Sequence, residues 1–582
     1  MESLRLTFPT QQQGQHLLVE TDHGELKNWL ASLPFGDMGR AVQEIKRAIA
    51  SLNRSSIGLG LRQELVELFD QTYKQIHDSY RPNASHIVND EARRKEHDNL
   101  HQLTREMAFA HKILVNGELK RRRLWGKNKA LIRSINLALH YLGILLIEHY
   151  ESYTPIPVYL WRECNSLYYY SQEKRIEDFT IFDDVMKYHC LPTIEQTYAR
   201  ICLMSVSNPY HLSQGEHWQM FRYLRDWVKM AEFSDDGDDH QPNRCFIVQL
   251  NSQLKPDYSS EFEGDINDEF IRFMLTHDLV LQINYHLDSL NANQHPPMGF
   301  HKGTSVPSAR SLLEHMLEHW SQKAERKGRR YPILTKLDAI WGLQPIYSLL
   351  VKHQQDIEST HWDGSQIEEL LQGEHNVPLA WEASNVSDGG IGLTTHKNIA
   401  HLLKVGDLVI IREYIDKKPS YHWRVAICRW LFGDENSGTR AGLEFITGYL
   451  NPVRLFNQAS KSVKSKGQAA LILKHRQEDG DNAAPSLIAS RGSYQDDRAF
   501  VMKYDNKEEN IRPRNRIMVT PCIEQFYYQT YDIVEVKEPT EQEGEEEIMG
   551  AIPWTSQPKF DEELSKEPNP SNLSDVRLPG DH

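Results

Sequence analysis

The spacing of hydrophobic side chains divides the chain into a helical first part and a β-rich second part. In residues 1–240 apolar positions recur three or four residues apart, which is the period of an amphipathic helix packed on a core. The two clearest runs are separated by a glycine-containing turn, and no fixed repeat length links the runs. We therefore predict an irregular helical bundle here. These two runs are Val42, Ile45, Ile49 and Leu52, and Leu61, Leu65, Leu68 and Phe69.

Prolines punctuate the rest of this region, and further helices are expected at 97–115, 129–150, 157–171, 194–206 and 215–232. Residues 241–308 have a mixed pattern, in which Cys245–Leu250 is strand-like and 268–290 is helical, so we expect a mixed connecting region. The acidic loop at 234–240 before it does not follow the DxDxDG order of a calcium loop and is interpreted as a solvated linker.

From about residue 330 the pattern changes to short runs of β-branched and aromatic residues separated by Gly, Asp and Asn. Evenly spaced short strands joined by turns are typical of a small antiparallel barrel. We expect such a barrel, with a leading helix, within residues 309–457, and a second small β domain within 468–535. The predicted strands are 335–341, 379–384, 390–394, 407–412, 423–431 and 441–446, then 469–473, 486–489, 499–504, 516–520 and 525–528.

Length and composition are those of a multidomain α+β globular protein. The chain of 582 residues is too long for one core, and its 39% hydrophobic and 25% charged content is ordinary. The net charge of −15 is concentrated at the end, because the residues from Lys537 on include twelve acids and four bases. We expect residues 536–582 to be a disordered acidic tail. The remaining −7 is not the charge of a polycationic nucleic-acid binder, so no DNA or RNA partner is expected.

The sequence indicates a cytoplasmic protein without a membrane span. The longest strongly apolar stretch, 141–147, is seven residues, far short of the ~20 that a spanning helix needs. The N-terminus has neither the basic nor the apolar region of a secretory signal. Six scattered cysteines without a CxxC pair indicate reduced thiols rather than a disulfide framework.

Arg326 and Arg330 form an RxxxR pattern that carries candidate binding chemistry. Two arginines offer bidentate donors to phosphate oxygens, or to O6 and N7 of guanine. Arg329 lies in the same stretch and is a third candidate contact, and Gly328 keeps the backbone pliable. The pattern alone is weak, because Arg512–Arg516 satisfies it too.

Asn385, Ser387 and Gly390 form a second pattern, [DN]xSxxG, in the sequence Asn-Val-Ser-Asp-Gly-Gly. The amide and the hydroxyl can hydrogen-bond to guanine edges, and the glycine lets backbone approach a ring closely. Alone, this is a common turn pattern, since Asn and Ser favour turns and Gly supplies positive φ.

The two patterns in this order, followed by Arg429-Trp-Leu and Arg440-Ala-Gly-Leu-Glu-Phe, resemble the PilZ domain over about residues 326–457. The resemblance implies a six-stranded barrel that binds the bacterial second messenger cyclic di-GMP. It further implies a non-catalytic receptor without cofactor or metal, which signals to a protein partner in motility, pilus or envelope machinery. The implied ligand-binding residues are Arg326, Arg329, Arg330, Asn385, Ser387 and Gly390.

The sequence departs from the family pattern in the distance between the two motifs. Fifty-four residues separate Arg330 from Asn385, more than the family usually has. The pattern predicts a helix at 344–351 and a linker at 352–376, so a segment at 342–377 is inserted. The insertion either leaves the site open or covers it. A covered site favours the alternative, a PilZ-like scaffold that no longer binds nucleotide and acts only through protein–protein contacts.

Competing motifs for catalysis are outweighed by structural interpretations. His315 and His319 match the HxxEH pattern of some zinc proteases, but their helix has an apolar face that predicts a packing role. The basic cluster at 120–129 precedes an amphipathic helix and is interpreted as a solvated helix start. No Walker motif, GxSxG or Cys–His pair stands out, so we predict that the protein is not an enzyme.

Overall fold

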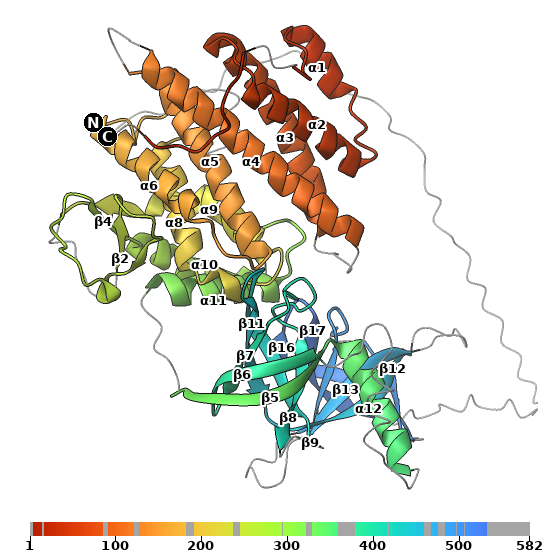
Figure 1. Cartoon of the computed structure of the whole chain (residues 1–582). Coiled ribbons are helices and arrows are strands. Elements are labelled where there is room, and N and C mark those ends of the chain that lie inside the picture. The colour runs from red at the N-terminus through yellow and green to blue at the C-terminus, as the bar shows by residue number, and fades with distance from the viewer. Residues whose placement is uncertain are drawn as a thin grey trace, which may run out of the picture. The chain divides into compact units, whose positions relative to one another are not determined.

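The computed structural model of the chain contains a helical region followed by two β-barrels (Figure 1). This confirms the predicted multidomain α+β class. The acidic tail lies outside the described residues. The structure describes residues 4–531 except 14–16, 85–90, 122–126, 182–190, 237–244, 294, 322–328, 359–378, 416–417, 421, 459–466, 475–483, 496–497 and 506.

Helices of the first region begin at capping residues that the sequence supplies. The side chains of Asp22, Asp37, Asn128 and Thr193 each accept a hydrogen bond from the backbone N–H three residues later. Such a cap satisfies a donor that the first helical turn leaves unpaired. The helices are α1 (His23–Ala31), α2 (Met38–Arg54), α3 (Leu59–Ala84), α4 (Glu91–Lys120), α5 (Lys129–Glu151), α6 (Val158–Glu173), α8 (Ile194–Val206), η1 (Pro209–His211), α9 (Glu216–Trp227) and η2 (Val228–Met230).

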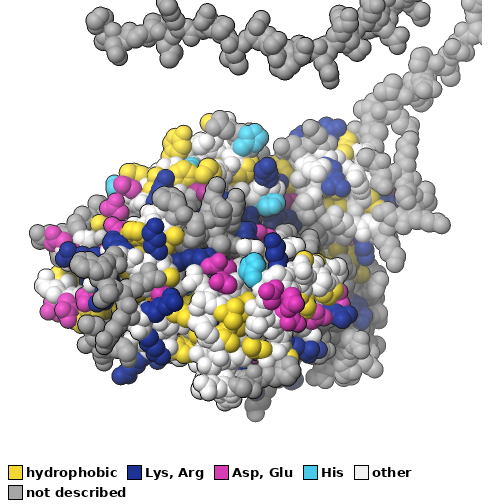
Figure 2. Space-filling view, turned by 90° about the horizontal axis from the view of Figure 1, so that it is seen from above, with side chains coloured by type: hydrophobic (Ala, Val, Ile, Leu, Met, Phe, Trp, Pro, Cys, Tyr) yellow, Lys and Arg dark blue, Asp and Glu magenta, His cyan; other side chains and the backbone are white. Residues whose placement is uncertain are grey.

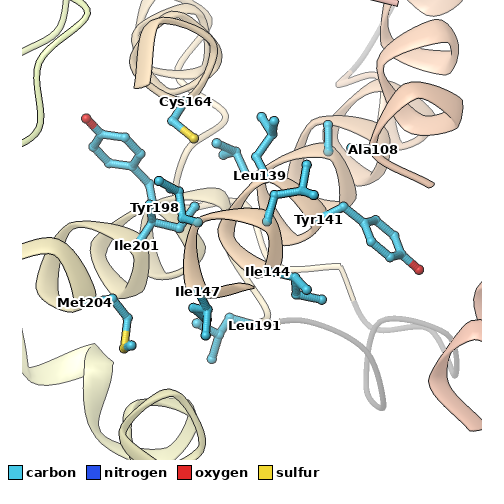
Figure 3. Close-up of a cluster of buried hydrophobic side chains, with 14 of the residues drawn as sticks. Ala108, Leu139, Tyr141, Ile144, Ile147, Cys164, Leu191, Tyr198, Ile201 and Met204 are labelled. Atoms are coloured by element: carbon cyan, nitrogen blue, oxygen red, sulfur yellow. The ribbon is translucent and has the colours of Figure 1, made fainter. Parts of the chain in front are cut away.

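Helix α5 is apolar on all sides and lies inside the helical core. Its side chains Leu139, Tyr141, Ile144 and Ile147 point in different directions, and α6 and α8 pack beside them (Figure 3). By length and composition α5 could cross a membrane, but 89% of its most apolar window is buried. A helix that is hydrophobic all round and buried in protein is a core helix.

A small antiparallel sheet and two helices follow the helical bundle. Helix α11 buries Leu312, Leu313, Met316 and Trp320 in the same hydrophobic cluster as the first helices. It therefore packs with the helical region, whereas the sequence had grouped it with the barrel that it precedes. The start of the helix expected at 268–290 is also wrong, because a strand occupies it. The elements are β1 (Glu232–Ser234), β2 (Cys245–Gln249), β3 (Asp257–Tyr258), η4 (Ser259–Glu261), β4 (Ile271–Leu275), α10 (His277–Asn293) and α11 (Val306–Ser321), with sheet order β1-β4-β2-β3.

Six antiparallel strands close into the first barrel, in the ring order β5-β6-β7-β11-β10-β8. Pairing of β8 with both β5 and β10 completes the ring. Buried side chains such as Trp381, Leu393 and Ile411 fill its interior. The strands are β5 (Tyr331–Trp341), β6 (Leu379–Ser387), β7 (Gly390–Thr395), β8 (Leu408–Ile415), β10 (Arg424–Asp434) and β11 (Gly438–Ile446), and the short β9 (Lys418–Pro419) extends the sheet beside β8.

The second β domain is also a closed barrel, in the ring order β12-β13-β14-β17-β16-β15. Leaving the short β9 aside, both rings join their strands in the order first, second, third, sixth, fifth, fourth. The two barrels therefore share one topology. The second lacks an [DN]xSxxG pattern between its second and third strands. Its strands are β12 (Tyr449–Asn457), β13 (Gln468–Lys474), β14 (Ser486–Ser490), β15 (Phe500–Tyr504), β16 (Lys507–Val519) and β17 (Ile523–Thr530).

The inserted segment after β5 begins with helix α12 (Leu343–Glu358), which contacts both barrels. Ile346 is buried in a cluster with Ile410 of the first barrel and Leu471 of the second. Tyr347 Oη accepts a hydrogen bond from Nε of Arg454 on β12 at 3.0 Å. Strand β12 itself pairs with β13 and β15, although the sequence had grouped residues up to 457 with the first barrel.

The surface carries both signs of charge. Figure 2 shows one face on which lysine and arginine side chains are scattered among acidic and neutral ones. On this face the basic side chains form no continuous stripe.

Candidate ligand site

The two sequence motifs meet at one end of the first barrel. The first residue of β5 is paired with Val386 on β6, so Arg330 lies at the level of Ser387. Ser387 is paired with Gly390 on β7, and Gly390 with Glu444 on β11. The end of RxxxR and the NxSxxG hairpin therefore lie in one row across four neighbouring strands. We call this row, together with the adjacent residues 427–430 in the middle of β10, the motif row.

Local contacts of the β6–β7 hairpin hold the polar side chains of NxSxxG. Ser387 Oγ donates to the carbonyl oxygen of Gly390 at 3.3 Å. Asn385 Nδ2 donates to Ser384 Oγ at 3.1 Å. A Cβ atom at Gly392 would lie only 2.8 Å from that Nδ2, so the amide lies across the bare backbone of β7. Asn385 and Ser387 are both half-buried and are held at the barrel surface.

Gly390 is required by close packing rather than by an unusual φ. A Cβ atom there would lie 2.3 Å from the carbonyl oxygen of Leu443 on β11. At the neighbouring Gly389 a Cβ atom would meet nothing within 4 Å. The glycine of the motif therefore allows β7 to approach β11, which keeps the hairpin beside Glu444.

The arginines of the first motif are only partly within the described chain. Arg329 and Arg330 are exposed at the start of β5, and Arg326 lies outside the described residues. An exposed guanidinium keeps its donors accessible to an anion. Arg330 is therefore the arginine of this motif that the structure brings to the NxSxxG hairpin.

Arg429 on β10 is a further cation of the motif row that the sequence did not single out as a site residue. A β-bulge between Cys428 and Trp430 removes Arg429 from regular pairing with β11. Its Nε donates to the Glu444 carboxylate, and both side chains are about half exposed. Exposed ion pairs contribute little to stability, so an anionic ligand can replace this carboxylate at low cost. The only sequence signal for Arg429 was its place in the run Arg429-Trp-Leu downstream of NxSxxG.

The helical region contacts the first barrel beside the motif row. The backbone N–H of Gly433 on β10 donates to the carbonyl oxygen of Tyr153 at 2.8 Å. The Tyr153 side chain is buried in the core cluster of the barrel. The η1 turn packs on β10, where the rings of His211 and Trp430 are within 26° of parallel and their centroids are 6.4 Å apart.

His211 is an exposed residue near Arg330 and Arg429 of the motif row. Desolvation by the packed protein, followed by the charges of His319, Arg330 and Arg429, lowers the pKa of His211 to about 4. The ring is therefore neutral at pH 7. No sequence pattern pointed to this residue, because it precedes the barrel by more than a hundred positions.

The HxxEH histidines have packing contacts in α11. His315 Nε2 lies 2.6 Å from the carbonyl oxygen of Ser207, so this nitrogen carries the proton and donates. The ring of His319 lies 4.5 Å from that of His315, centroid to centroid. Within the described part of the chain, no three His, Cys, Asp or Glu side chains group as metal ligands.

Comparison with known proteins identifies the family. Residues 24–239 match the family model described as cyclic-di-GMP receptor FimW, N-terminal domain, and residues 348–452 match its middle PilZ domain. The chain belongs to the FimW family. The two matches cover more than half of its length and confirm the resemblance of the first barrel to PilZ. The PilZ match begins after RxxxR, so it does not include the three arginines.

A curated relative is similar over most of the chain. The cyclic-di-GMP receptor FimW of Pseudomonas aeruginosa is 21% identical over 594 residues, which include 91% of this chain and 94% of the relative. The similarity therefore extends over the helical region and both barrels.

Proposed function

We propose that this protein is a non-catalytic receptor for cyclic di-GMP, which binds at the motif row of the first barrel and transmits binding to a protein partner. Membership of the FimW family and the name of the Pseudomonas relative support the ligand. The observation that carries the proposed site is the strand register, because it aligns Arg330 with Ser387 and Gly390.

The chemistry of this row suits a cyclic dinucleotide. Cyclic di-GMP carries two phosphates and two guanines. Guanidinium groups at 326, 329 and 330 offer paired donors to phosphate oxygens or to guanine O6 and N7. Asn385 and Ser387 offer an amide and a hydroxyl to the guanine edges. The strand register holds these groups beside Arg330, and close packing at Gly390 keeps their hairpin against β11.

The remaining expectations complete the proposal. We propose a cytoplasmic location, a partner in motility, pilus or envelope machinery, and no DNA, RNA, metal or cofactor. A receptor family supports the absence of catalysis. The proposed domains are a helical bundle at 1–240, a connecting region from 241 that includes α11, the PilZ barrel from β5 to β11 with its insertion, and a second β domain that begins with β12.

A calorimetric titration of the full chain with cyclic di-GMP tests this function. We expect Arg330→Ala to weaken binding roughly 10- to 100-fold, the scale of one charge-assisted hydrogen bond of about 1.5–3 kcal/mol. Cyclic di-AMP should bind more weakly than cyclic di-GMP, because adenine has no O6 acceptor for an arginine.

The matched control is Arg512→Ala. Arg512 belongs to the other RxxxR pattern, is exposed on β16, and lies over the ring of Tyr531 at 4.7 Å. The Arg512→Ala variant should bind cyclic di-GMP with the affinity of the wild type. If the wild-type chain gives no heat of binding, the proposal that cyclic di-GMP is the ligand is refuted. If both variants lose affinity equally, the proposal that the ligand binds at the motif row is refuted.

The alternative, a scaffold without nucleotide binding, is not favoured. The described part of the insertion, α12, packs on β5 and β8 of the first barrel and on the second barrel. Arg330, Asn385 and Ser387 are all present at the motif row. The same titration decides between the two functions.

A further inference from the structure

We propose that His211 of the helical region is an additional binding residue of the motif row, where it contacts a phosphate of the bound nucleotide together with Arg330 and Arg429. This inference rests on the proposed function and extends the site from the barrel to the helical region. The ligand would then contact the barrel and the helical region at the same time, so binding would act directly on the helices.

The position of His211 is set by packing. The η1 turn lies against β10, and residues Met1–Tyr531 form one compact unit. Trp430, the ring neighbour of His211, is held in turn by Gly442 on β11. A Cβ atom at Gly442 would lie 1.8 Å from the indole Nε1, so the indole lies flat against bare backbone. The imidazole is thus fixed beside the bulge that carries Arg429.

The charges around His211 favour an anion. The guanidinium groups of Arg330 at the start of β5 and of Arg429 on β10 act on its imidazole, and His319 of α11 acts on it when protonated. Among the acids here, Glu444 on β11 is paired with Arg429, and Glu318 lies near His319. Cationic groups gathered around one exposed ring repel one another, and a phosphate placed among them relieves the repulsion.

A phosphate at this position would also change the protonation of His211. The free imidazole is neutral at pH 5.5, because desolvation and the neighbouring cations lower its pKa to about 4. A bound anion acts in the opposite direction and raises that pKa. Binding at pH 5.5 should therefore be accompanied by uptake of a proton, and binding at pH 7.5 by little or none.

Other histidines nearby are distinguishable from His211. His315 on α11 is half-buried and His217 on α9 is buried, and they donate to the carbonyl oxygens of Ser207 and Pro209. Both also have lowered pKa values because of burial. The Nε2–H group of each is therefore already used in a hydrogen bond within the protein. His319 is the remaining neighbour whose protonation could respond.

The experiment is calorimetry with the full chain and cyclic di-GMP at pH 5.5 and 7.5, each in two buffers of different ionisation enthalpy. The variants are His211→Asn and, as control, His396→Asn. His396 is exposed just after β7, at the end of that strand opposite to Gly390. We expect His211→Asn to weaken binding about tenfold, the scale of one hydrogen bond to a charged group, and to reduce the proton uptake. His396→Asn should bind like the wild type.

The outcomes separate this inference from the proposed function. A wild-type chain that does not bind overturns both. Wild-type binding that His211→Asn leaves unchanged, in affinity and in proton uptake, overturns only the role of His211. If His211→Asn fails to fold, the wild-type chain still gives the test, because an enthalpy independent of buffer at pH 5.5 contradicts the inference.

Discussion

Gly390 offers the sharpest test of how the barrel holds its ligand motif, because its neighbour Gly389 is a matched control. In Gly390→Ala the new methyl group would lie 2.3 Å from the carbonyl oxygen of Leu443, so β7 and β11 must separate by at least ~0.7 Å to restore a 3.0 Å contact. In Gly389→Ala the methyl group meets nothing within 4 Å.

The magnitude follows from the two strands involved. Overpacking against backbone costs about 1–3 kcal/mol, and a weakened hydrogen bond of the β7–β11 ladder adds about 1 kcal/mol. We therefore expect Gly390→Ala to lower the local stability by about 2–4 kcal/mol. Gly389→Ala should change it by less than about 1 kcal/mol, and with a favourable sign, because alanine restricts the unfolded chain.

Hydrogen exchange measured by mass spectrometry is the suitable assay, since one unfolding midpoint does not describe a multidomain protein. Peptides from β7 and β11 in Gly390→Ala should exchange roughly 30- to 900-fold faster than in the wild type. Peptides of the second barrel serve as the internal reference and should not change. Equal exchange rates in the two alanine variants would falsify the close-packing argument.

Two further predictions concern buried charge and protonation. Asp338 on β5 accepts hydrogen bonds from Arg412 on β8 at 2.8 Å, and both are buried. Asp338→Asn should lower the local stability by about 3–5 kcal/mol, measured by hydrogen exchange of peptides from β5 and β8, and adding Arg412→Met should recover most of it. No recovery in the double variant would contradict this account. The pKa of buried His217 is lowered to about 4 by desolvation, so the unfolded chain binds a proton that the folded chain does not as pH falls below 6.5. The free energy of unfolding should then decrease by up to about 1.4 kcal/mol per pH unit towards pH 4, and the His217→Asn variant should lack this part of the pH dependence. Parallel pH profiles of the variant and the wild type would show that His217 is not responsible.

Local patterns were enough to predict much of the fold and part of the site. Helices appeared in the sequence as runs such as Val42 to Leu52, because a helix buries one face at a fixed period. The β6–β7 hairpin was predictable for a similar reason, since Asn385, Ser387 and Gly390 are neighbours in the chain. Their geometry depends on one tight turn between paired strands.

Which distant elements of the chain pack or pair with each other was not predictable in this way. The sequence grouped α11 and β12 with the first barrel, but α11 packs on the helical core and β12 pairs within the second barrel. Periodicity shows that a face must be buried and does not show against which element. That choice depends on the combined shape of surfaces hundreds of residues apart.

The RxxxR and NxSxxG motifs show this division clearly. RxxxR and NxSxxG could be recognised from the sequence alone, and with them the PilZ resemblance. Their meeting at one row, and the approach of Arg429 and His211 to it, were decided by strand register and by the packing of η1 on β10. Sequence determines which chemical groups are available, whereas only long-range strand pairing and packing bring those groups together at one end of the barrel.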